Sequence, residues 1–139
     1  MEAIERKITE GIAIEKFNFV RATMNEAFRL KNNLIEDNRD FNKIIVDLSE
    51  CDYIDSTFLG ALIYSYRRIR ERNGILVLII GHTQLSKSFI YDEISKMFRV
   101  FRTLEEAVDE LSNKNKLRES AKLQQIQLNL SDRIDCSIN

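Results

Sequence analysis

The chain has 139 residues, a formal net charge of -1 and 44% hydrophobic residues, which predicts one globular domain with a single core. The small net charge argues against binding nucleic acid or an anionic membrane through a basic field. No apolar run approaches the roughly 18 residues of a membrane span, and the first ten residues lack a signal-peptide core. We therefore expect a cytoplasmic protein with reduced thiols. Neither a ligand cluster nor a glycine-rich phosphate loop is present, so no metal and no cofactor are predicted.

The first two expected elements are short strands over residues 2–8 and 12–17. The second of these reads IAIEKF, in which apolar residues alternate with small or polar ones. Glu10 and Gly11 between them form a turn signal, so the pair is predicted to be a hairpin or two edge strands. The sequence has no proline and only four glycines, which favours short connections between regular elements.

From Val20 onward the apolar period changes to three or four residues, which predicts an amphipathic helix with one buried stripe. The polar residues 36–42 are the expected exit loop. The predicted stripe consists of Val20, Met24, Ala27, Phe28, Lys31 and Ile35, with Leu30 and Leu34 beside it.

Residues 44–48 and 75–80 are apolar runs of strand length, which is typical of strands covered by helices. Between them, apolar residues from Phe58 to Ile69 follow a helical period. We expect this second helix to end at Asn73-Gly74, with the glycine in the left-handed conformation.

The last elements of the core are a third helix over residues 85–98, a very short strand around Val100 and a fourth helix. A capping box formed by Thr103 and Glu106 is expected to open the fourth helix. The alternation of strands and helices predicts an α/β fold with largely parallel pairing. A core domain is expected over residues 1–112, and residues 113–139 form a C-terminal extension, either an added helix or a mobile tail.

Three small polar residues, Asp55, Ser56 and Thr57, lie where a strand region gives way to the second helix. Functional residues gather at this edge of parallel sheets, and three interpretations remain open. Asp55 or Ser56 caps the helix. Alternatively Ser56 is a nucleophile with His82 as its base, although no G-x-S-x-G elbow is present. Third, Ser56 is phosphorylated: a helix N-terminus tolerates the dianion, which would repel a partner docked above it.

The stretch KIIVDLSECDYIDSTFLGALIYSYRRIRERNGILVLII resembles the STAS domain family, whose members include bacterial anti-sigma factor antagonists. The family pattern is a strand ending in D-L-S, a short loop, and D-S-[ST]-G-L-G at the start of a helix. Here these motifs read Asp47-Leu48-Ser49 and 55-DSTFLG-60. The ending MFRVFRTLEEAVDEL also resembles the family, so that the resemblance covers residues 1–112.

This resemblance implies a small mixed sheet of four or five strands with about four helices packed mainly on one side. It further implies a non-enzymatic role in transcription regulation by partner switching. The unphosphorylated domain would bind an anti-sigma factor that is a serine kinase, which phosphorylates Ser56, and a phosphatase would reverse the reaction. Asp55 would shape the switch loop, and Thr57 would be the neighbouring hydroxyl.

Two positions depart from the family pattern. Phe58 replaces the glycine after the hydroxyl pair, so its ring either enters the core or enlarges the docking surface. Asn18 stands where antagonists of the family usually have an aspartate near the phosphoserine loop. This departure favours an alternative function, a non-phosphorylated STAS scaffold or a module that binds a small ligand.

A run of arginines on the second helix has two interpretations. It is either a solvated helix face or a surface for an acidic partner, and no aromatic platform accompanies it that would favour nucleic acid. The partner's identity and the oligomeric state are not predicted. The run consists of Arg67, Arg68, Arg70 and Arg72.

Overall fold

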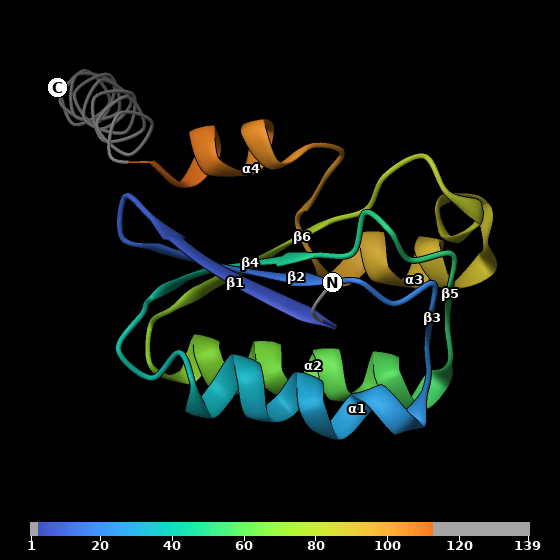
Figure 1. Cartoon of the computed structure of the whole chain (residues 1–139), viewed down its shortest axis with the longest axis horizontal. Coiled ribbons are helices and arrows are strands. Elements are labelled where there is room, and N and C mark those ends of the chain that lie inside the picture. The colour runs from blue at the N-terminus through green and yellow to red at the C-terminus, as the bar shows by residue number, and fades with distance from the viewer. Residues whose placement is uncertain (1–2, 113–139) are drawn as a thin grey trace, which may run out of the picture.

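A mixed sheet with strand order β1-β2-β4-β6-β7 forms the centre of the molecule in the computed structural model, which describes residues 3–112 (Figure 1). β1 pairs antiparallel with β2, and all the other neighbours are parallel. The predicted α/β class and the size of the sheet are confirmed. The strands are β1 (Ile4–Thr9), β2 (Ile12–Phe17), β4 (Lys43–Asp47), β6 (Ile75–Ile79) and β7 (Val100–Phe101).

The turn between β1 and β2 confirms the predicted hairpin. Glu10 and Gly11 have φ angles of 51° and 76°, the positive values that the favoured two-residue hairpin turns require. Both strands are six residues long and pair along their whole length.

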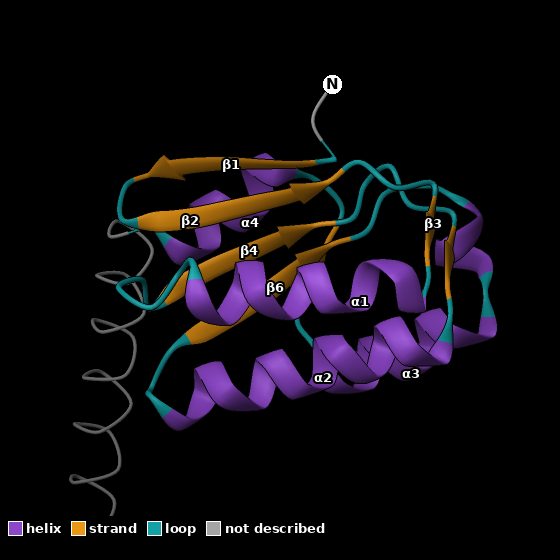
Figure 2. Ribbon diagram, turned by 60° about the horizontal axis from the view of Figure 1, so that its bottom comes forward, coloured by secondary structure: helices purple, strands orange, loops and turns teal. Residues whose placement is uncertain are grey.

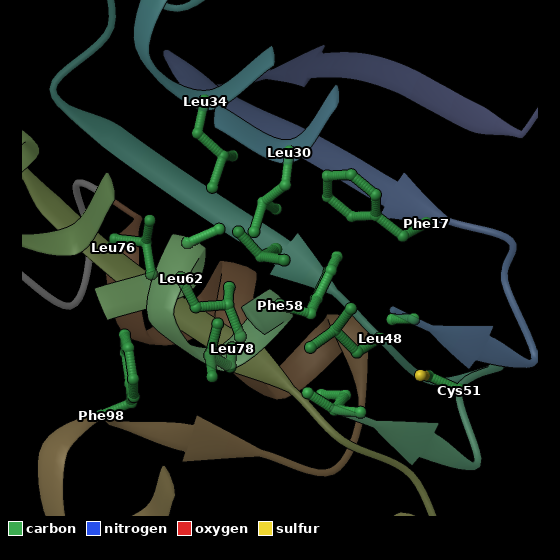
Figure 3. Packing of buried hydrophobic residues seen from close by; sticks show 14 of the residues in the cluster. Phe17, Leu30, Leu34, Leu48, Cys51, Phe58, Leu62, Leu76, Leu78 and Phe98 are labelled. Atoms are coloured by element: carbon green, nitrogen blue, oxygen red, sulfur yellow. The ribbon is translucent and has the colours of Figure 1, made fainter. Parts of the chain in front are cut away.

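Within residues 3–112, three helices cover one face of the sheet and a fourth covers the other face (Figures 1 and 2). The larger core lies under the first three. Figure 3 shows Phe58 and Leu62 of the second helix packed toward Leu78 of β6. The helices are α1 (Met24–Lys31), α2 (Ser56–Glu71) and α3 (Phe89–Met97) on the first face, and α4 (Leu104–Leu111) on the second.

Short irregular elements complete the fold. β3 (Arg21–Ala22) and β5 (Tyr53–Ile54) form a separate parallel pair that was not predicted. A π-helical turn, η1 (Asn32–Glu36), continues α1, and a 3-10 turn, η2 (Gln84–Lys87), precedes α3. The predicted extension over residues 113–139 lies outside the described residues.

The predicted buried stripe of the first helix is wrong in part, because Ala27, Leu30 and Leu34 are buried as expected and other members of the stripe are exposed. Val20, Met24 and Phe28 are 60%, 67% and 71% exposed, and the helix begins only at Met24. Thr23 and Glu26 form a capping box that fixes this start. Two neighbouring stripes of α1 both contain apolar residues at helical spacing, so periodicity did not identify the one that faces the sheet. The buried stripe consists of Ala27, Leu30 and Leu34.

Three smaller expectations also need correction. The residue in the left-handed region after α2 is Asn73, at φ 64°, and not Gly74. Gly74 is required for space, because a Cβ there would lie 2.7 Å from Ile69 Cγ2. The third helix is divided into η2 and α3. Thr103 accepts a hydrogen bond from the Glu106 N–H, which is one half of a capping box.

A buried glutamate ties β2 to the region after α1. Glu15 is fully buried, and its Oε1 accepts a hydrogen bond from Asn38 Nδ2 at 3.0 Å and lies 3.2 Å from Arg6 Nε. Its other carboxylate oxygen has no hydrogen-bond partner in the described structure. Burial raises the pKa of this carboxyl, and the hydrogen bonds and the Arg6 charge oppose that rise only in part.

Candidate functional site

The Asp55 carboxylate joins the starts of two helices. Its Oδ1 accepts a hydrogen bond from the Phe58 N–H at 2.8 Å, and this bond caps α2. Its Oδ2 accepts one from the Met24 N–H at 3.0 Å, at the first residue of α1. Each helix start has unpaired N–H groups and a partial positive charge, so an anion between them stabilises both.

The two hydroxyl residues after Asp55 face solvent. Ser56 and Thr57 are both exposed on the first turn of α2. Phe58 is fully buried and lies edge-on to Phe17 at 6.4 Å between ring centroids. The ring therefore enters the core, which was one of its two predicted alternatives, and does not enlarge the docking surface.

A second carboxylate lies beside this site. Glu26 Oε2 accepts hydrogen bonds from the Thr23 backbone N–H and hydroxyl, both at 2.8 Å. Burial tends to raise the pKa of Glu26, but these bonds outweigh it and hold the pKa below its usual value. Two carboxylates, Glu26 and Asp55, thus lie near the N-termini of α1 and α2, and each accepts hydrogen bonds from backbone N–H groups.

Hydrogen bonds from two sides fix the loop that leads to Asp55. The Val20 carbonyl accepts from the N–H groups of Asp52 and Tyr53, at 2.8 and 3.2 Å. On the other side, the Thr83 hydroxyl donates to the Cys51 carbonyl at 2.8 Å. Cys51 is buried, which raises the pKa of its thiol and keeps it protonated. Ser56 is therefore presented by an ordered segment.

The remaining predicted site residues lie at the same end of the sheet. Asn18 directly follows β2, is partly buried, and its N–H donates to the Ala3 carbonyl at 2.8 Å. His82 is exposed, and within residues 3–112 it makes no hydrogen bond to Ser56. The geometry gives no support to the hydrolase interpretation.

Exposed apolar side chains near Ser56 were missed by the sequence interpretation. Val20, Met24 and Phe28 are residues first assigned to the core. Met24 begins α1 and its N–H bonds to Asp55, Val20 lies four residues before it, and Phe28 lies one helical turn after it. Lys31 on the same helix lies over the ring of Tyr64, an exposed residue of α2, at 4.9 Å. The Thr23-x-x-Glu26 pattern was the signal that would have placed Val20 outside the helix.

The arginine run on α2 is only partly available to a partner. Arg72 donates to the carbonyls of Asn38 and Phe41, at 2.8 and 3.0 Å, and so joins the end of α2 to the segment before β4. Arg68 Nη1 lies 3.5 Å from Glu71 Oε2, and Arg70 Nη1 donates a hydrogen bond to the Tyr66 hydroxyl at 3.2 Å, so both side chains already have a partner on α2.

Residues 3–112 contain neither a cluster of metal ligands nor a membrane-spanning helix. No group of three or more histidine, cysteine, aspartate or glutamate side chains gathers there in a way that would hold a metal ion. In the same part of the chain, none of the helices has the length and apolar character needed to cross a membrane.

Comparison with known proteins gives consistent results. A Thermotoga maritima protein, named as a candidate anti-sigma factor antagonist, is 25% identical over 77 residues, which are 55% of this chain and 68% of that protein. The crystal structure of a candidate antagonist from the same organism has a TM-score of 0.68 at 22% identity, covering 78% of this chain and 93% of the other.

A further solved structure is the anti-sigma factor antagonist SpoIIAA in its unphosphorylated form. It has a TM-score of 0.60 at 16% identity and covers 78% of this chain and 97% of its own. The phosphorylated form of SpoIIAA from Bacillus has a TM-score of 0.59, also at 16% identity, with coverages of 78% and 99%. The family model for the STAS domain matches residues 1–107, so the chain belongs to the STAS domain family.

Proposed function

We propose that this chain is a regulator of the anti-sigma factor antagonist type that is switched at Ser56. Unmodified, it binds an anti-sigma factor that is also a serine kinase; phosphorylated, it releases that partner, and a phosphatase restores the first state. The observation that carries the proposal is the exposed Ser56 hydroxyl directly after the Asp55 cap. The proposal is supported by the names of the relatives and by the structures of SpoIIAA, which was solved in both its unphosphorylated and its phosphorylated form.

The folded domain tolerates a phosphoryl group at this position. Such a group adds about -1.5 to -2 charges at neutral pH, and the N-terminus of α2 favours negative charge. Because the Asp55 carboxylate already accepts from Phe58 and Met24, the phosphoryl group would extend into solvent without replacing the cap. The fold therefore stays intact in both states.

A docked partner, in contrast, would be repelled. The exposed apolar residues Val20, Met24 and Phe28 favour a partner with a matching apolar surface next to Ser56. Burying a dianion at the margin of that contact costs desolvation energy, and an acidic partner group would add repulsion. A loss of about 1.4 kcal/mol of binding free energy raises the Kd of the complex tenfold.

The test uses the purified chain, ATP and each anti-sigma kinase encoded in the same genome. We expect one kinase to transfer phosphate to Ser56, located by mass spectrometry, and to leave Ser56→Ala unlabelled while still labelling Thr57→Ala. Ser56→Asp should bind that kinase at least tenfold more weakly than Ser56→Ala. Equal labelling of Ser56→Ala and the native chain would refute the assignment.

The second candidate function is a STAS scaffold or small-ligand module without phosphorylation. Asn18 favours it, because antagonists that resemble this chain usually have a carboxylate there. This function predicts that Ser56→Asp leaves partner affinity almost unchanged. A tenfold loss would reject it, and so the same binding experiment distinguishes the two functions.

A further inference from the structure

A groove of about 620 Å³ lies on the face of the sheet opposite α1 and α2, between α4 and the β1–β2 hairpin. It exists because α4 has eight residues and packs over β4, β6, β7 and the apolar residues of β2, which leaves β1 without a covering helix on this face (Figure 1). The apolar residues that line it are Ile14 of β2 and Leu104 and Val108 of α4.

We propose that this groove is a docking site for the segment that follows Ser112 in this same chain, centred on Leu117 and Leu123. The first observation is position. Ser112 itself lines the groove, so the chain leaves α4 at the edge of the uncovered surface. A segment attached there is present at a high effective concentration, on the order of millimolar, without any second molecule.

The length of the connection allows this contact. α4 has eight residues and is about 12 Å long, at about 1.5 Å per residue. The five residues after Ser112, which are 113–117, span up to about 17 Å when extended, at about 3.3 Å each. Leu117 can therefore reach any point along the α4 side of the groove.

Charge complementarity identifies the same occupant. The rim of the groove has three acidic side chains, Glu10, Glu105 and Asp109, and one basic side chain, Lys7. Residues 113–122 read NKNKLRESAK and contain four basic residues and one acidic residue. Opposite charges that flank an apolar contact favour one register and one partner over others. Both the apolar and the charged features of the groove thus match the segment attached to it.

The experiment places a nitroxide label on the full-length chain. Ser120→Cys combined with Cys136→Ser gives one accessible thiol, because Cys51 is buried. With methyl groups of Ile, Leu and Val observed by NMR, we expect selective broadening of the signals of Ile14, Leu104 and Val108. The signal of Val20, which follows β2 at the end of that strand away from the hairpin turn, should keep its width.

Two variants of the labelled chain separate apolar docking from mere proximity. Leu117→Asp with Leu123→Asp should abolish the selective broadening. Asn115→Asp with Gln125→Asp adds the same charge at polar positions and should retain it. Neither pair alters residues 3–112, so the core domain remains folded in both.

Two outcomes would overturn the proposal. If the groove signals broaden only when labelled chains are mixed with unlabelled, isotope-enriched chains, the occupant is a second copy. If no methyl group broadens selectively in the labelled chain, the segment does not dock and the groove serves a different partner. Both results are independent of Ser56 and leave the proposed switch untouched.

Discussion

Replacement of Asp55 by alanine tests whether one carboxylate stabilises two helix starts. The substitution removes the acceptors of the Phe58 and Met24 N–H groups, at 2.8 and 3.0 Å. Loss of an N-cap costs about 1 kcal/mol, and a hydrogen bond to a charged group contributes about 1.5 kcal/mol or more. The expected loss of unfolding free energy is therefore about 2–3 kcal/mol. Asp55→Asn keeps one acceptor oxygen and should lose about 1 kcal/mol.

The assay is urea denaturation followed by circular dichroism. With a slope of about 2 kcal/mol per molar urea, the Asp55→Ala midpoint should fall by about 1–1.5 M. Asp40→Ala is the matched control, since Asp40 is an exposed aspartate in the turn before β4 and should change the stability by less than about 0.5 kcal/mol. Equal midpoints for the two alanine variants would show that the Asp55 bonds contribute no stability.

Substitutions at four further positions test stability. Gly60→Ala adds a Cβ in open space within α2 and should stabilise the protein by about 0.5–1 kcal/mol. Gly74→Ala places its Cβ against Ile69 and should destabilise the protein by about 1–3 kcal/mol, so that equal melting temperatures for the two variants would contradict the packing. Phe58→Ala should cost about 3–5 kcal/mol in urea titrations, and Phe58→Leu clearly less; equal losses would argue against a closely packed ring. The pKa of Glu15 is raised in the folded state. Its contribution to the free energy of unfolding is therefore full below the ordinary glutamate pKa, and it is lost as the pH rises through the pKa of the folded state. Relative to the native chain, Glu15→Gln should therefore gain stability as the pH rises above the ordinary glutamate pKa, whereas a difference that stays constant with pH would contradict the shift.

The central sheet could be predicted from the sequence because its two central parallel strands, β4 and β6, are nearly continuous apolar runs. Residues 44–48 and 75–80 coincide closely with β4 and β6, and the positive φ angles at Glu10 and Gly11 match the predicted turn. β3 and β5 were missed because two residues have no measurable period. The side of α1 that faces the sheet was also predicted incorrectly, because the set of residues that forms this side depends on where the helix begins.

The candidate site was predictable where the information is local. The exposed Ser56 and the cap at Asp55 follow from the residue types at the start of a helix. The second bond of Asp55, to Met24, joins residues 31 positions apart and depends on how α1 and α2 pack, which spacing does not encode. The exposure of Phe28 depends on the same packing.

The double role of the Asp55 carboxylate changes how such a motif should be interpreted in other chains. A residue that anchors two helices is under selection for folding alone, whatever happens at its neighbour. Under the switch proposed at Ser56, a change of that serine would remove regulation and leave both helix starts capped by the same aspartate. The presence of the acidic residue in a chain therefore indicates the fold, and only the hydroxyl after it bears on the proposed control.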